Sequence, residues 1–152
     1  MSAQIAVPDY VWWLIPGKLG GMSRPPLEDL VRLDRAGMRG IVSVMDEPSG
    51  IEEYREAGFE ALWLPIIGGK PPTVEQVKQF VQFAKPLITK DRSVVVHCTS
   101  GNRRTGTLLA AYLIAEGELP QKAIALIKEA RPTAELRDAQ TEFLFSLPQL
   151  LG

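Results

Sequence analysis

Short apolar runs alternate with amphipathic segments along this chain, and the alternation constrains its fold more than any other feature. Runs rich in apolar and β-branched residues cover 10–15, 40–46, 59–65 and 93–97. Apolar residues at helical spacing predict helices over about 27–36, 50–57, 73–88, 104–116, 120–130 and 135–147. Continuous apolar strands separated by helices are typical of a parallel sheet that is covered on both faces. We therefore expect one α/β domain over residues 1–152, with a mostly parallel central sheet of four or five strands and helices on both faces.

Composition excludes several classes of function. The formal net charge is −1, from 17 basic and 18 acidic residues, which argues against a nucleic-acid partner or a membrane-surface partner. One cysteine and one histidine cannot form an internal disulfide or a zinc cluster, so we expect no metal and no cofactor. The first apolar run is short and follows no basic segment, which predicts neither a signal peptide nor a membrane span. We expect a monomer in the cytoplasm.

The single histidine and the single cysteine, His97 and Cys98, are adjacent at the end of the apolar run 93–97. Ligands of parallel α/β sheets bind beyond the carboxyl ends of the strands, where helices begin. A loop that turns from a strand into a helix can direct several backbone N–H groups at an anion, and the helix N-terminus adds its positive end. We therefore expect this loop to bind phosphate through residues 99–104, namely Thr99, Ser100, Gly101, Asn102, Arg103 and Arg104.

The residue types in this loop indicate nucleophilic chemistry. Arg104 follows Cys98 after five residues and can hold a phosphoryl group with two parallel hydrogen bonds. A cysteine in such a positive field exists largely as thiolate, which is a nucleophile for phosphorus. Thr105 can donate its hydroxyl to the sulfur, and His97 can bond to the loop backbone. Taken singly, a buried cysteine, a buried histidine and two surface arginines are ordinary; their joint spacing favours a phosphate site.

The stretch HCTSGNRRTG resembles the signature of the cysteine-dependent protein tyrosine phosphatases, in which histidine and cysteine precede a glycine, an arginine and a serine or threonine. The segments LIPGKLGGMSRP, LPIIGGKPPTVEQVKQFV and TGTLLAAYLIAEGELPQKAIALIKEARP are similar to the small atypical dual-specificity branch. The resemblance implies a phosphatase-like domain with its cysteine loop at 97–105. It also implies metal-independent hydrolysis of a phosphorylated protein or small phosphomonoester through a phospho-cysteine. The catalytic residues would be Cys98, Arg104, Thr105 and His97.

One expected residue is missing. Members of this family usually carry an aspartate shortly before a proline pair, and it protonates the leaving oxygen. Here Gly68 stands at that place, and no acidic residue occurs between Glu60 and Glu75. General acid catalysis is typically worth about 10²–10⁴-fold, so its absence matters most for alkyl leaving groups. Three carboxylates are candidates for a surrogate acid, although each is also an ordinary surface charge: Glu135, Asp46 and Glu47.

Two further alternatives remain open. Lys70 and Arg103 are either exposed loop cations or a binding site for a second anionic group, such as that of a phosphoinositide or a polyphosphate. The missing acid also permits a catalytically weak pseudophosphatase that binds phosphorylated ligands without turnover. The retained Cys98 and Thr105 favour the enzyme.

Overall fold

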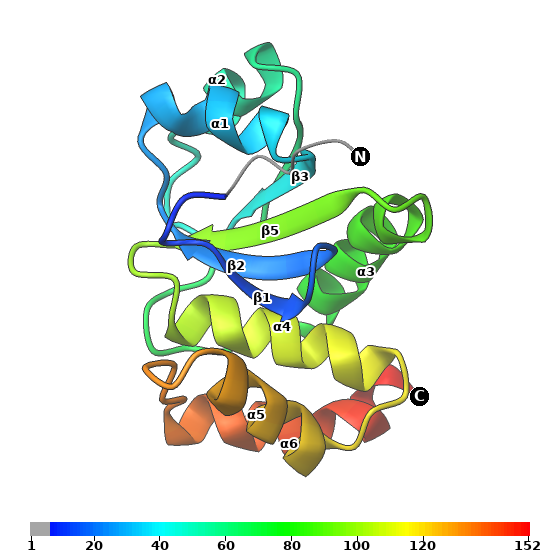
Figure 1. The fold of residues 1–152 in the computed structure, drawn as a ribbon. Coiled ribbons are helices and arrows are strands. Elements are labelled where there is room, and N and C mark those ends of the chain that lie inside the picture. The colour runs from blue at the N-terminus through cyan, green and yellow to red at the C-terminus, as the bar shows by residue number, and fades with distance from the viewer. Residues whose placement is uncertain (1–6) are drawn as a thin grey trace.

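A five-stranded sheet forms the centre of the protein (Figure 1). The structure is a computed structural model, and it describes residues 7–152. The strand order is β1-β2-β5-β3-β4, and every neighbouring pair is parallel except the antiparallel pair β1 and β2. The strands are β1 (Trp12–Ile15), β2 (Leu19–Ser23), β3 (Met38–Ser43), β4 (Glu60–Trp63) and β5 (Ser93–Cys98).

Helices cover both faces of this sheet, and the predicted α/β class is confirmed (Figure 1). A 3₁₀ turn (η1, Leu27–Asp29), α1 (Leu30–Arg35) and α2 (Ile51–Glu56) lie on one face. The other face carries α3 (Val74–Thr89), α4 (Arg103–Ala115), α5 (Pro120–Ala130) and α6 (Asp138–Leu151). Each layer of helices buries its apolar side chains against the sheet, which gives two hydrophobic clusters. Within residues 7–152, no helix is long and apolar enough to cross a membrane.

Strand β2 is the one strand that the sequence did not predict. It contains Gly20 and Gly21, and glycine is depleted in strands because it has no side chain to pack. The strand forms because it pairs with β1 on one side and β5 on the other. A Cβ on Gly21 would lie 2.6 Å from Thr105 Cγ2 and 2.6 Å from the Trp12 ring. The glycine therefore marks a close approach of neighbouring groups to the strand backbone.

The remaining differences from the predicted elements are at their ends. Strands β3 and β4 end two or three residues earlier than predicted, so residues 44–46 and 64–65 belong to loops at the carboxyl edge of the sheet. Helix α6 begins at Asp138, so Glu135 precedes the helix. A capping box opens α3, with Thr73 and Gln76 bonded reciprocally.

Candidate active site

The loop between β5 and α4 holds the candidate nucleophile. Cys98 is the last residue of β5, and α4 begins at Arg103. Because β5 lies between β2 and β3, this loop is flanked by the chain segments that leave both neighbouring strands. Asn102, the N-cap residue of α4, makes no side-chain cap bond, so its side chain is available to other partners.

The sulfur of Cys98 accepts hydrogen bonds from the loop and from the start of α4. The Gly101 N–H donates at 3.2 Å and the Thr105 hydroxyl donates at 3.1 Å. Burial by itself raises the pKa of the Cys98 thiol. The hydrogen bond from the Thr105 side chain, with those from the backbone of Thr105, Gly101 and Asn102, outweighs burial and leaves the pKa below its ordinary value. The site therefore stabilises an anionic sulfur.

The loop backbone is pressed against strand β2. Gly101 has φ +77°, and a Cβ there would lie 2.5 Å from the backbone carbon of Met22. The Trp12 indole N–H donates to the Gly101 carbonyl at 3.0 Å. The left-handed φ and the close contact with Met22 both require glycine at position 101.

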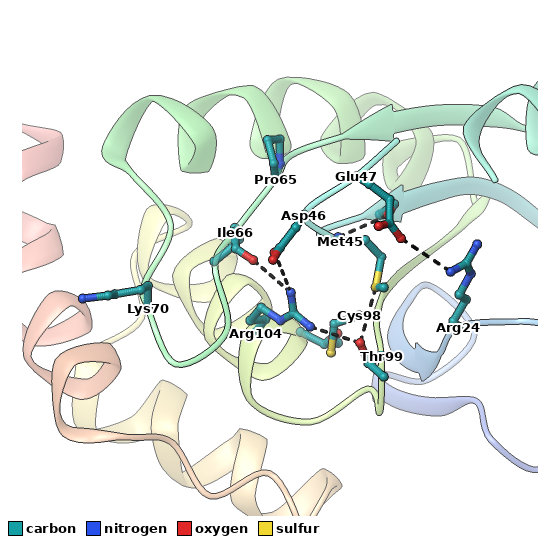
Figure 2. A network of polar contacts seen from close by, with 12 residues as sticks. Arg24, Met45, Asp46, Glu47, Pro65, Ile66, Lys70, Cys98, Thr99 and Arg104 are labelled. Carbon is teal, nitrogen blue, oxygen red and sulfur yellow. Dashed lines mark hydrogen bonds and ion pairs between the residues drawn. The ribbon is translucent and has the colours of Figure 1, made fainter. Parts of the chain in front are cut away.

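Arg104 lies beside Cys98 and is held by three partners (Figure 2). Its Nη1 donates to the Ile66 carbonyl at 2.9 Å and to Asp46 Oδ1 at 3.2 Å, and its Nη2 donates to Thr99 Oγ1 at 3.2 Å. The three partners come from the loops after β3, β4 and β5. The arginine is therefore positioned by all three loops that meet at this edge of the sheet.

His97 is completely buried and acts on the loop backbone, as expected. Its Nδ1 lies 3.4 Å from the Cys98 carbonyl, and its Nε2 lies 3.0 Å from the Tyr54 hydroxyl. Burial is the main cause that lowers the pKa of His97 to about 4. The hydrogen bond to the Cys98 carbonyl opposes this shift, and the positive charges of Arg24 and Arg104 add to it. The imidazole is therefore neutral near pH 7. Since a carbonyl can only accept, the proton is on Nδ1 and the Tyr54 hydroxyl donates to Nε2.

Tyr54 was not singled out from the sequence. It lies on α2 and is completely buried, and burial is the main cause that raises its pKa to about 12. Its hydroxyl therefore keeps the proton that it donates to His97. No local motif marks this residue, because its partner is 43 positions away in the chain.

A pocket of about 550 Å³ opens above Cys98. Of the six residues predicted to bind phosphate, four line it, while Gly101 packs on β2 and Thr99 contacts Arg104. Its other walls come from the loop after β4 and from the segment that leads into α6. Besides Cys98, the lining consists of Ser100, Asn102, Arg103, Arg104, Gly68, Gly69, Lys70, Thr133, Arg137 and Ala139.

The segment before α6 supports the cysteine loop from outside. Asn102 Oδ1 accepts hydrogen bonds from Arg131 Nε at 2.9 Å and from the Thr133 hydroxyl at 3.0 Å. Arg103 Nε donates to the Glu135 carbonyl at 2.8 Å. The N-cap residue and the first residue of α4 are thereby tied to one segment, which fixes the start of this helix.

The three candidate surrogate acids occupy different surroundings, and none of them lines the pocket. Asp46 contacts Arg104. Glu47 lies 3.8 Å from Arg24, and Figure 2 shows this ion pair as a dashed line. Glu135 is exposed and reaches the site through its backbone carbonyl.

A family profile described as "Polymorphic toxin system, DSP-PTPase phosphatase" matches residues 17–118. This range contains most of the sheet, the cysteine loop and helix α4. The chain belongs to the dual-specificity protein tyrosine phosphatase family. The family resemblance inferred from HCTSGNRRTG is therefore confirmed.

Named relatives of this dual-specificity phosphatase agree with the family assignment. Phosphatidylglycerophosphatase and protein-tyrosine phosphatase 1 of Mus musculus is 32% identical over 130 residues, which cover 78% of this chain and 67% of the relative. The Homo sapiens protein of that name is 29% identical, with 64% of its length covered. Tyrosine-protein phosphatase CDC14 of Candida albicans is 27% identical, and 23% of it is covered. The chain thus spans about two thirds of the mammalian relatives and less than a quarter of CDC14.

Solved structures show the same fold. Tk-PTP in the active form matches with a TM-score of 0.83 at 23% identity, over 93% of this chain and 97% of that chain. PTPMT1 in complex with PI(5)P matches with a TM-score of 0.83 at 27% identity, over 94% of this chain and 97% of that chain.

Proposed function

We propose that this protein hydrolyses phosphomonoesters through a covalent phospho-Cys98 intermediate, without a metal. The observation that carries the proposal is the pair of hydrogen bonds to the Cys98 sulfur, from the Gly101 N–H and the Thr105 hydroxyl. Both bonds favour the thiolate, and binding a phosphate without turnover requires no thiolate. Hydrolysis is therefore favoured over the pseudophosphatase alternative.

In the first step, the substrate phosphate binds the loop N–H groups and Arg104. The thiolate of Cys98 attacks phosphorus, so that an S–P bond forms while the ester P–O bond breaks. Arg104 stabilises the charge on the equatorial oxygens, which is the main demand of phosphoryl transfer. The leaving oxygen takes a proton from solvent or from a surrogate acid.

In the second step, water attacks the phosphoryl group of phospho-Cys98. The P–O bond to water forms, the S–P bond breaks, and the proton of the water passes to phosphate or solvent. The Thr105 hydroxyl, 3.1 Å from the sulfur, stabilises the thiolate as it leaves. The products are inorganic phosphate and the starting thiolate, so the cycle closes without a cofactor.

Proton donation to the leaving group decides which esters react fastest. Gly68 lines the pocket where the family carries its aspartate, and no Asp or Glu side chain lines it. Aryl phosphates, whose phenols leave without protonation, are therefore the proposed preferred substrates. A surrogate acid stays a prediction that amide variants test. Asp46→Asn, Glu47→Gln or Glu135→Gln would each remove the alkaline limb of the pH profile of kcat if that residue supplied the proton.

The names of the relatives and the single thiol support a substrate class and a compartment. The mouse relative is named as both a phosphatidylglycerophosphatase and a protein-tyrosine phosphatase, and PTPMT1 was crystallised with PI(5)P. A phosphorylated protein or a small phosphomonoester is accordingly the proposed substrate.

The lone thiol of Cys98 must stay reduced, which supports a reducing compartment such as the cytoplasm. The monomer stays a prediction.

The test is hydrolysis of para-nitrophenyl phosphate in the presence of EDTA, with Cys98→Ser as the control. We expect turnover that Cys98→Ser abolishes, and acid quenching should trap a chain heavier by one phosphoryl group. A chain that binds phosphate analogues without turnover at any pH would contradict the proposal and restore the pseudophosphatase alternative.

A further inference from the structure

The pocket above Cys98 carries more positive charge than one phosphate requires. Arg104 and the loop N–H groups already supply donors for the phosphate on Cys98. Lys70, Arg103 and Arg137 also line the pocket, and no Asp or Glu side chain does. Within residues 7–152, none of these three cations forms an ion pair. Unpaired cations in a concave site raise the local concentration of anions.

The three cations are held in place by groups that leave their charges free. Arg103 Nε donates to the Glu135 carbonyl at 2.8 Å, and its terminal nitrogens have no partner among residues 7–152. Gln140, which is completely buried, accepts from the Arg137 N–H at 2.8 Å, and its Nε2 lies 3.5 Å from the Lys70 carbonyl. One buried amide therefore positions the backbones of two cationic residues, which is the arrangement of a preorganised binding site.

The loop after β4 keeps the pocket open between these cations and Cys98. A Cβ on Gly68 would meet no atom within 4 Å. Gly69 has φ +79°, and the Arg137 side chain passes 3.4 Å from the place of its missing Cβ. Figure 2 shows the Lys70 side chain extending away from Cys98, so Lys70 marks the outer end of the pocket. The surplus charge therefore lies apart from the reacting phosphate.

We infer that the pocket binds a substrate with two phosphate groups, one on the cysteine loop and the second between Lys70, Arg103 and Arg137. The inference rests on the proposed hydrolysis at Cys98 and adds the substrate class. Arg103 and Arg137 can each donate two parallel hydrogen bonds to a phosphate, and Lys70 adds a point charge. A soluble bisphosphate and a lipid headgroup with a second phosphate share this chemistry.

The experiment compares two aryl esters, phenyl phosphate and para-phenylene bisphosphate, by release of inorganic phosphate. We expect the wild-type kcat/KM for the bisphosphate to exceed that for the monophosphate by about tenfold or more, which is the effect of one charge-assisted hydrogen bond. In the double variant Lys70→Ala, Arg137→Ala this ratio should fall by about the same factor. The control is Lys78→Ala, Lys122→Ala, which removes two exposed lysines outside the pocket and should keep the wild-type ratio.

Binding to the Cys98→Ser variant, measured by titration calorimetry, separates this inference from the proposed function. We expect the bisphosphate to bind about tenfold more tightly than phenyl phosphate and to lose this advantage in Lys70→Ala, Arg137→Ala. This result supports the second subsite even if the wild type shows no turnover. Turnover with equal kcat/KM for both esters, or a ratio unchanged in the double variant, overturns the inference while hydrolysis stands. A higher rate on phosphatidylinositol monophosphate in phosphatidylcholine vesicles than on its deacylated headgroup would identify the substrate as a lipid. A higher rate on the deacylated headgroup would identify a soluble substrate.

Discussion

Replacing Gly68 with aspartate should give this phosphatase the proton donor that its loop lacks. Gly68 lines the pocket, and a Cβ at this position would meet no atom within 4 Å. Its φ lies outside the left-handed region, so a side chain adds no backbone strain. The carboxyl group can therefore enter the pocket without displacing Cys98 or Arg104.

The expected gain follows from the proton that this carboxyl carries. General acid catalysis contributes about 10²–10⁴-fold when the acid is protonated. An aspartate with an ordinary pKa of about 3.9 is protonated in roughly one molecule in 14 at about pH 5. The nearby Lys70 and Arg137 favour its ionised form, which reduces this fraction further. We expect kcat for phosphoserine to rise by about tenfold at that pH, with a much smaller rise for para-nitrophenyl phosphate.

The assay is kcat against pH for both substrates, with Gly69→Asp as the matched control. Gly69 adjoins the same pocket, but its φ of +79° disfavours a side chain. The gain in Gly68→Asp should fade by about tenfold per pH unit above the pKa of the new acid, since only its protonated form donates. A folded Gly68→Asp protein whose phosphoserine rate does not rise, or rises equally at all pH values, would refute the proposed absence of a loop acid.

Three further predictions test single contacts. Thr105→Val removes a hydrogen-bond donor to the Cys98 sulfur, so kcat should fall by about ten- to a hundredfold, with a burst of nitrophenol. Iodoacetamide should alkylate Cys98, the single cysteine, at a higher pH in this variant than in the wild type. Gly101→Ala should lower the free energy of unfolding, measured in urea, by about 2–4 kcal/mol, because the new Cβ meets backbone atoms. Gly117 also has a positive φ but open space around it, so Gly117→Ala should lower this free energy by about 1 kcal/mol. Equal losses in the two variants would contradict the explanation by packing. Folding keeps His97 neutral down to about pH 4 while the unfolded chain protonates it near 6.5, so stability should fall by about 3 kcal/mol as pH drops between these values. The NMR titration of this single histidine checks the cause, and a midpoint near its ordinary value would disprove it.

The sequence predicted the parts of the site that are continuous in the chain. Cys98, Arg104 and Thr105 lie within eight positions, and their spacing alone determines that one loop can present them to an anion. The buried strand before the loop was predicted from its valines, because a continuous apolar run leaves few alternatives. The helices were predicted within a few residues, since the spacing of their apolar residues is a local signal.

The rest of the site depends on contacts between distant segments. Tyr54 reaches His97 across 43 positions, and Gln140 lies next to Lys70 across 70. Neither pair leaves a periodic pattern in the sequence. Strand β2 was not predicted, because a glycine such as Gly21 ordinarily disfavours a strand. Only the three-dimensional packing shows that Thr105 occupies the space of the side chain that Gly21 lacks.

Because Arg104 donates to the backbone carbonyl of Ile66, its position does not depend on the side chain at position 66. Any amino acid at position 66 supplies the same backbone oxygen, and the side chains of residues 67–70 make none of the hydrogen bonds that hold Arg104. Apart from Gly69, whose φ of +79° disfavours a side chain, this stretch is therefore open to wide substitution, including at the exposed Ile67 and the pocket residue Lys70. A library that varies residues 67, 68 and 70 can therefore change which esters enter the pocket while the contacts that hold Arg104 stay intact.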